Sequence, residues 1–104
     1  MELAQLALVA RHRGELEHAR SLAREALELE QRAASLVPFE QASEPTRSIL
    51  YRSAASLAYQ AGELKVAQRL VAQGLAGFPP AEVEAELNDL YQQFHFELSL
   101  QAQG

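Results

Sequence analysis

The sequence predicts an all-α domain, a stack of five helices made of two helical hairpins and a C-terminal capping helix. Three observations predict it. Small and apolar residues recur at helical spacing along most of the chain, prolines and most glycines fall between those stretches, and one helix–glycine–helix pattern occurs twice. The 104 residues have the length of one domain, and they include no cysteine, so an ordinary apolar core must hold the fold.

The internal repeat has an offset of 48 residues. The segment GELEHA at 14–19 returns as GELKVA at 62–67, and eight positions are identical over about 21 aligned residues. Most of the identical residues are small or apolar and lie at helical spacing, so we interpret them as packing positions. Two helices alone cannot bury their apolar stripes, and the two units are therefore expected to stack on each other.

The first hairpin is expected over residues 1–36. Gly14 supplies the left-handed turn that ends its first helix. The second helix is expected from about residue 15 to Leu36, because neither glycine nor proline interrupts the pattern before Pro38. The first helix should bury the stripe Leu3, Leu6, Ala7 and Ala10. The second helix should bury the stripe Leu16, Ala19, Leu22, Ala23, Ala26, Leu27, Leu29, Ala33 and Leu36.

A connector is expected over 37–45, between Pro38 and Pro45, with Ser43 as the N-cap of the third helix. The second hairpin follows over 46–77 and turns at Gly62. Its third helix should bury Ile49, Tyr51, Ala54, Ala55, Ala58 and Tyr59, and its fourth helix Leu64, Ala67, Leu70, Val71 and Leu75.

The capping helix is expected over 80–102, after a Gly-Phe-Pro-Pro break at 77–80. It carries one broad stripe of Val83, Leu87, Leu90, Tyr91, Phe94 and Leu98. Residues 94–100 also alternate as a strand would, but nothing breaks the helix after Leu90, so helix is favoured. Residues 80–104 hold five acids and no Lys or Arg, whereas the first 79 residues hold nine acids and nine bases. The net charge of −5 therefore lies on the last helix.

The helix–glycine–helix unit resembles the tetratricopeptide repeat (TPR). The second unit places Tyr51, Ala54, Ala55, Ala58, Gly62, Ala67, Val71, Gly74 and Pro79 at that family's pattern positions. The first unit places Leu3, Leu6, Ala7, Ala10, Gly14, Ala19, Ala23 and Ala26 there. The resemblance covers about residues 1–31 and 48–80. Gln31 stands where the family has its terminating proline, which explains the long second helix. The resemblance implies a protein–protein interaction module with a capping helix.

In such proteins a peptide lies along the inner face formed by the first helix of each unit. The resemblance places Gln5, Leu8, Arg11, His12, Arg52, Ser53, Ser56, Tyr59 and Gln60 on that face. The carboxylate-clamp lysine and asparagine of some members are absent, since Ala4, Leu8 and Ser53 stand at their places. Arg11 and Arg52 favour an acidic partner. The alternative is that this face is an ordinary solvated helix surface.

No catalytic or cofactor site is expected, so the protein is not expected to be an enzyme. Glu15 and His18 have Glu-x-x-His spacing, but carboxylate di-metal bundles need two such motifs and two further glutamates, so a solvated pair is favoured. His12 between two arginines could bind an anion, although an exposed helix end is the simpler interpretation. A phosphate-binding glycine loop is also absent from the sequence.

The composition also narrows the partners and the location. An excess of acids argues against nucleic acid, and no apolar run approaches the ~18 residues of a membrane span. The start Met-Glu-Leu lacks the basic segment of a signal peptide, so a cytoplasmic protein is expected. Its function is expected to be that of a non-catalytic interaction module or adaptor. The alternative is a small regulatory or antitoxin-like protein that masks one enzyme.

Self-association is also expected. Phe96 and Leu100 lie opposite the main stripe of the last helix, and Leu8 and Val9 lie outside the stripe of the first helix. A two-fold homodimer through residues 94–100 is the simplest way to cover them, with Phe94, Phe96 and Leu100 as the interface candidates.

Overall fold

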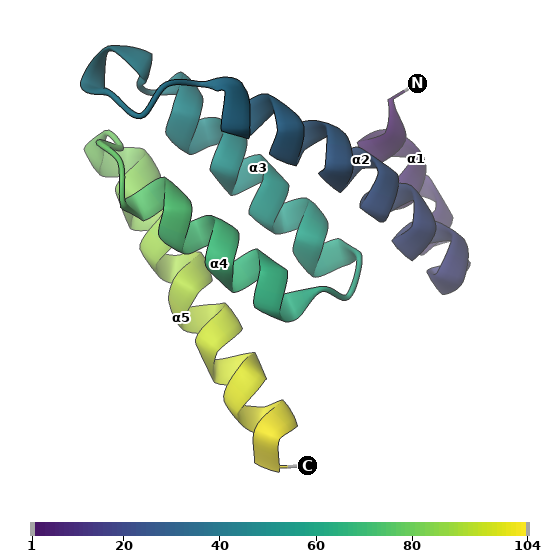
Figure 1. Cartoon of the computed structure of the whole chain (residues 1–104). Coiled ribbons are helices and arrows are strands. Elements are labelled where there is room, and N and C mark those ends of the chain that lie inside the picture. The colour runs from purple at the N-terminus through teal and green to yellow at the C-terminus, as the bar shows by residue number, and fades with distance from the viewer. Residues whose placement is uncertain (1, 104) are drawn as a thin grey trace.

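The computed structural model describes residues 2–103, and within this range it is entirely helical and loop, without strands. The α-helices are α1 (Leu3–His12), α2 (Leu16–Leu36), α3 (Thr46–Gln60), α4 (Leu64–Leu75) and α5 (Ala81–Gln103) (Figure 1). A short 3-10 helix, η1, covers Gln41–Ser43. The predicted all-α fold of five helices is confirmed, and residues 94–100 are helical.

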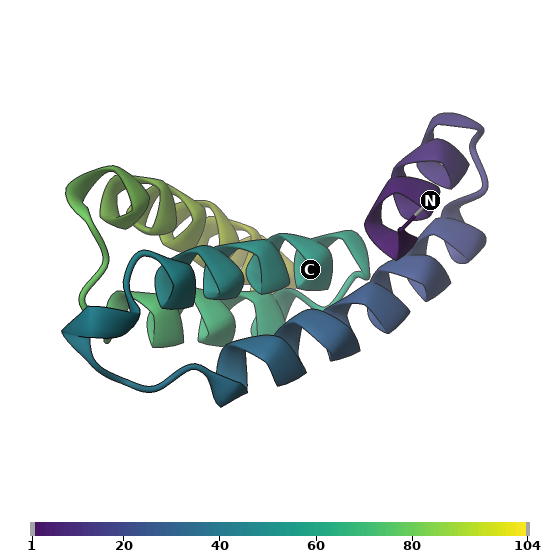
Figure 2. The same cartoon turned by 90° about the horizontal axis from the view of Figure 1, so that it is seen from above.

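The helices pack in chain order, each on the next, and α3 also contacts α5. The molecule measures 41 × 38 × 20 Å, and its short dimension is about the thickness of two helices. Helices α1, α3 and α5 lie toward one side, and α2 and α4 lie toward the other (Figure 2). One face of the molecule therefore presents α3 between α1 and α5.

Both predicted glycine turns are confirmed. Gly14 has φ of 77° and Gly62 has φ of 80°, the left-handed region that glycine adopts without steric cost. After each glycine the chain turns back in the same way. The Glu15 amide donates to the Ala10 carbonyl at 2.9 Å, and the Glu63 amide donates to the Ala58 carbonyl at 2.8 Å. These bonds satisfy carbonyls that the helix ends would otherwise leave unpaired.

The core combines small residues of α2, α3 and α4 with larger side chains of α4 and α5. Leu70, Val71, Leu87 and Phe94 are its largest fully buried apolar residues. The three helices α3, α4 and α5 approach closely at Gly74 in α4. A Cβ there would lie 3.1 Å from the Tyr51 Cβ and 3.2 Å from a Leu87 methyl group. A glycine at this position therefore allows the second hairpin and α5 to pack together.

The stripe predicted for α2 is partly wrong. Ala19, Ala23, Ala26 and Leu27 are buried as predicted. Leu16, Leu29 and Leu36 are exposed instead, and the buried residue near the C-terminal end is Ala34. The reason is that α2 changes neighbours along its length. Its Ala23 packs with α1, whereas its residues from Ala26 onward pack with the core around α3 and α4.

The N-cap predicted for α3 is also wrong. Ser43 belongs to η1, and α3 begins at Thr46 after a cis Glu44–Pro45 peptide bond. Glu44 contacts the first turn of α3 instead, because its carboxylate accepts a hydrogen bond from the backbone amide of Ser48 at 3.0 Å. The same carboxylate accepts a hydrogen bond from the backbone amide of Phe78, after α4, at 3.1 Å. Burial alone would raise the pKa of Glu44. The hydrogen bonds from Ser48 and Phe78 and the charge of Arg47 outweigh burial and hold that pKa below its ordinary 4.5.

Arg47 joins the connector, α3 and the end of α4. Its side chain is buried, and its guanidinium lies 4.7 Å from the centre of the Phe39 ring and 4.8 Å from that of Tyr51. Its Nη1 donates to the Gln73 carbonyl at 3.1 Å. A Cβ at Gly77 would collide with this guanidinium. The arginine therefore supplies a cation–π contact to each ring and pairs a carbonyl near the C-terminal end of α4.

Candidate partner-binding groove

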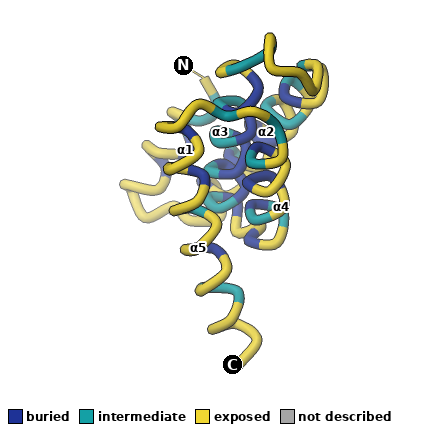
Figure 3. Tube along the Cα trace, turned by 90° about the vertical axis from the view of Figure 1, so that its left-hand side faces the viewer, coloured by how far each residue is buried: buried dark blue, intermediate teal, exposed yellow. Residues whose placement is uncertain are grey.

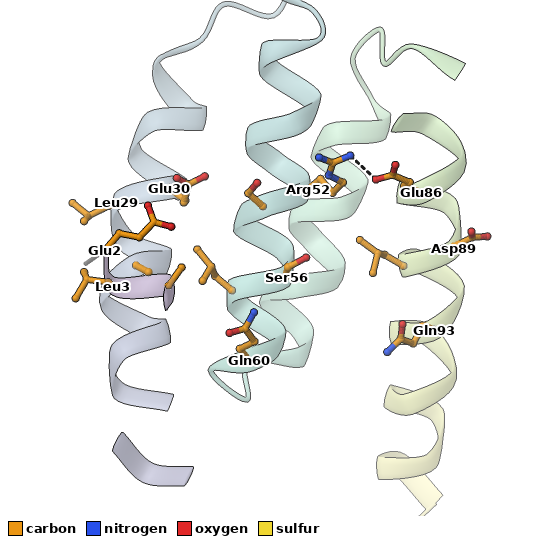
Figure 4. Close-up of a pocket in the computed structure, with 15 residues that line it drawn as sticks. Glu2, Leu3, Leu29, Glu30, Arg52, Ser56, Gln60, Glu86, Asp89 and Gln93 are labelled. Carbon is orange, nitrogen blue, oxygen red and sulfur yellow. Dashed lines mark hydrogen bonds and ion pairs between the residues drawn. The ribbon is translucent and has the colours of Figure 1, made fainter. Parts of the chain in front are cut away.

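A groove of about 710 Å³ opens on the face that presents α1, α3 and α5. Helix α3 lies along its middle, the N-terminal end of α1 and part of α2 form one wall, and α5 forms the other wall (Figure 4). Its volume is within the range of ~300–1,000 Å³ that is usual for ligand-binding clefts.

The middle of the groove is formed by the face of α3 that turns away from the core. Ala54, Ala55 and Ala58 of this helix are fully buried. Ser53, which precedes them, and Ser56, which lies between Ala55 and Ala58, line the groove. Their side chains are short, so the groove stays deep along α3.

The two walls supply apolar surface. Leu3 of α1 and Leu29 of α2 line one side, Leu90 of α5 lines the other, and Leu57 of α3 lies between them. Leu29 is more than half exposed. These leucines form the apolar strip of the groove, in which Leu29 is exposed, Leu3 and Leu90 are partly buried and Leu57 is 6% exposed.

The charge of the groove is acidic. Glu2 and Glu30 line the wall formed by α1 and α2, and Glu86 and Asp89 line the wall formed by α5. Arg52 is the one basic residue among the described residues that line it, and its guanidinium is ion-paired with the Glu86 carboxylate. The ion pair engages Arg52, one of the two arginines expected to attract an acidic partner, and no other Lys or Arg among the described residues lines the groove beside Glu2, Glu30 and Asp89.

Four residues predicted for the inner face, Arg52, Ser53, Ser56 and Gln60, line this groove. The other five are distributed differently. Arg11 and Tyr59 line a smaller cavity of about 230 Å³ between the first hairpin and the C-terminal part of α5, and Gln60 borders both cavities. Gln5, Leu8 and His12 are exposed on α1 and line neither cavity.

Tyr59 has a packing role in the structure. Its hydroxyl donates to Glu97 Oε1 at 3.0 Å, and its ring stacks on Phe94 at a centroid distance of 5.2 Å. The hydrogen bond to Glu97, together with burial and the negative charge of Glu97, raises the pKa of Tyr59. Tyr59 therefore fixes α5 against α3 and thereby sets the position of one groove wall.

Sequence reasoning did not identify the residues that α2 and α5 contribute. Leu29 was assigned to the buried stripe, and α5 was assigned to capping. The spacing of Glu86, Leu90 and Gln93 at i, i+4 and i+7 does place them on one helix face. That spacing would have indicated a second surface on α5, beside the face that buries Leu87 and Phe94.

One dimer-interface candidate is wrong. Phe94 is 1% exposed and belongs to the core, so it cannot contact a second copy. Phe96 and Leu100 are 63% and 52% exposed. They lie on the C-terminal turns of α5, which project beyond the other helices (Figure 3). Dimerisation through these two residues stays a prediction.

Within residues 2–103, no group of three or more acidic or histidine side chains is arranged to hold a metal ion. Glu15 and His18 are both exposed. None of the described helices combines the length and the apolar character that a membrane crossing requires. Comparisons with protein-family models, curated proteins and solved structures found no match to this chain.

Proposed function

We propose that this protein is a non-catalytic, TPR-like protein–protein interaction module whose partner binds in the groove along α3. The observation that supports this most is the apolar strip of Leu3, Leu29, Leu57 and Leu90 in an open groove of about 710 Å³. Contiguous apolar surface in a concave site is typical of sites that another molecule covers.

The chemistry of the groove suits binding better than catalysis. Ser53 and Ser56 are the hydroxyl residues that line it, and among the described residues neither hydroxyl is hydrogen-bonded to a carboxylate or histidine that could act as its base. Arg52, the one Lys or Arg among the described residues that line the groove, is ion-paired with Glu86. The groove thus offers apolar contact, charge and hydrogen-bonding groups without an activated nucleophile.

The arrangement of helices supports the TPR-like part of this proposal. The chain alternates between the two layers, so that α1, α3 and α5 share the face that carries the groove. Both turns use glycine at positive φ, at the positions that the family resemblance assigns to Gly14 and Gly62. In this proposal α5 contributes a wall of the binding site in addition to covering the end of the second hairpin.

Blocking the groove tests this function. Ser56→Trp places a large ring on the middle of the groove, and Ser35→Trp places the same ring on an exposed turn of α2 that lies outside it. We expect wild type and Ser35→Trp to capture the same partner from cells that make the protein, and Ser56→Trp to lose it. Capture that is unaffected by Ser56→Trp would contradict the proposal. A single enzyme recovered in stoichiometric amount would favour the regulatory alternative, in which the same groove masks that enzyme.

A further inference from the structure

Acidic side chains stand on both walls of the groove, on the same two walls that carry Leu3, Leu29 and Leu90. Glu30 is on the α2 side and Asp89 is on the α5 side, with Ser56 of α3 between them (Figure 4). Glu2 adds a further charge on the side of α2, and Glu86 adds one on the side of α5. A bound segment would therefore meet both negative charge and apolar side chains at each of the two walls.

The walls offer no backbone to which an extended peptide could pair. All the described lining residues except Glu2 belong to α-helices, whose backbone groups are bonded within each helix. A peptide in strand form would lose water from its amides in an apolar groove and gain few partners. A segment that satisfies its own backbone, an α-helix, suits this groove better.

We propose that the groove binds an amphipathic basic helix of a partner protein, an inference that rests on the proposed function. The apolar side chains of that helix, at i, i+3 or i+4 and i+7, contact the leucine strip. Its Lys and Arg side chains pair with the carboxylates of the two walls, Glu30 on the side of α2 and Asp89 at the outer edge of α5, where its carboxylate is directed away from α3 (Figure 4). Glu86 holds Arg52 and contributes less to this pairing.

Electrostatics beyond the groove favours the same partner. The chain carries a net charge of −5, and α5 contributes five acids without a compensating base. A basic helix is therefore attracted to this side of the molecule before contact. An acidic segment would meet like charge at both walls and find Arg52 already paired.

Two synthetic peptides test the charge requirement. The basic probe is a designed peptide of about 18 residues, with leucines at i, i+3, i+4 and i+7 and lysines on both flanks. In the acidic probe every lysine is replaced by glutamate. Titration calorimetry should show binding of the basic probe, weakening as salt is added, and no binding of the acidic probe. Amide chemical-shift changes should be concentrated at the groove positions of α2, α3 and α5.

A matched pair of double variants locates the charges. Glu30→Lys with Asp89→Lys reverses one acid on each wall. Glu28→Lys with Glu84→Lys makes the same change in net charge on the same two helices, at exposed positions outside the groove. We expect the groove variant to weaken binding of the basic probe about tenfold or more and the control about twofold or less. Circular dichroism checks that both variants remain helical.

Three results would overturn the inference. Equal weakening by both double variants would show that the net charge, rather than the groove, attracts the probe. Tighter binding of the acidic probe at the same groove residues would reverse the partner's charge and leave the proposed function intact. If neither probe binds there while Ser56→Trp still abolishes capture of the cellular partner, the groove is a binding site for a different kind of segment.

Discussion

The two hairpins of this protein share one sequence pattern and one turn geometry, yet they differ in burial. Gly14 and Gly62 have nearly the same φ, 77° and 80°. Leu16 and Leu64 occupy equivalent positions at the 48-residue offset, but Leu16 is 56% exposed and Leu64 is 8% exposed. The local sequence therefore determines the turn, whereas the neighbouring helices determine how much the side chains that follow it are buried.

The neighbours of the two hairpins explain this difference. The second hairpin lies between α2 and α5 and is also tied by Arg47 to the connector. The first hairpin lies at one end of the stack, and α1 packs almost entirely on α2. One wall of the groove is thus formed by the less supported hairpin, and the middle of the groove by the better supported one.

The largest contrast between the hairpins should appear on truncating their equivalent leucines. We expect Leu64→Ala to lower the free energy of unfolding by about 2–5 kcal/mol, because it leaves a cavity in the core. Leu16→Ala should change it by about 0.5 kcal/mol or less, because the side chain is largely in water. Chemical denaturation followed by circular dichroism measures both. Similar losses in the two variants would show that the hairpins are equally supported.

The glycine turns should show the opposite behaviour, with equal effects in the two hairpins. Gly14→Ala and Gly62→Ala each force a side chain to positive φ, which costs about 1–2 kcal/mol. A Cβ at Gly14 would meet nothing within 4 Å, and one at Gly62 would lie in ordinary contact with Arg20, at 3.6 Å. We therefore expect thermal melts to show similar shifts. A much larger effect at Gly62 would mean that packing, rather than backbone conformation, sets the cost.

The smallest expected change in unfolding free energy comes from Glu44. Its carboxylate lies beside the second hairpin and has no equivalent beside the first hairpin. Its pKa is held below its ordinary 4.5, so it stabilises the fold above about pH 4.5, and this contribution is lost as the pH falls through the lowered pKa. The difference in unfolding free energy between wild type and Glu44→Gln should therefore be present at pH 7 and shrink toward pH 3. Glu40→Gln, an exposed change in the same connector, serves as the control. A difference that is independent of pH would contradict this role.

Local patterns predicted most of the fold. The glycines at 14 and 62, the prolines near 38, 45 and 79, and the helical spacing between them were sufficient for five helices close to their observed positions. The contact of Glu44 with the first turn of α3 was not predictable in this way, because its carboxylate is held partly by the amide of Phe78, far along the chain. The exposure of Leu29 and Leu36 was also missed, because α2 changes from one neighbour to another along its length.

The candidate site was only half predictable. The family resemblance placed the α3 residues Arg52, Ser53 and Ser56 on the inner face, and these three residues line the groove. The charge of the groove could not be predicted from the sequence, because it depends on α5 lying beside α3. In that arrangement the Glu86 carboxylate is ion-paired with the Arg52 guanidinium. Which helices share a face is a tertiary property, and the sequence pattern of each helix alone does not contain it.

The most direct measurement of the difference between the hairpins is amide hydrogen exchange along the chain in the absence of a partner. We expect the amides of α3 and α4 to exchange most slowly, since they open only when the core around Leu70 and Phe94 unfolds. Amides of α1 should exchange markedly faster, because this helix can separate from the end of the stack on its own. Protection of α1 as strong as that of α3 and α4 would contradict the conclusion that neighbouring helices, rather than the shared sequence pattern, set the stability of each hairpin.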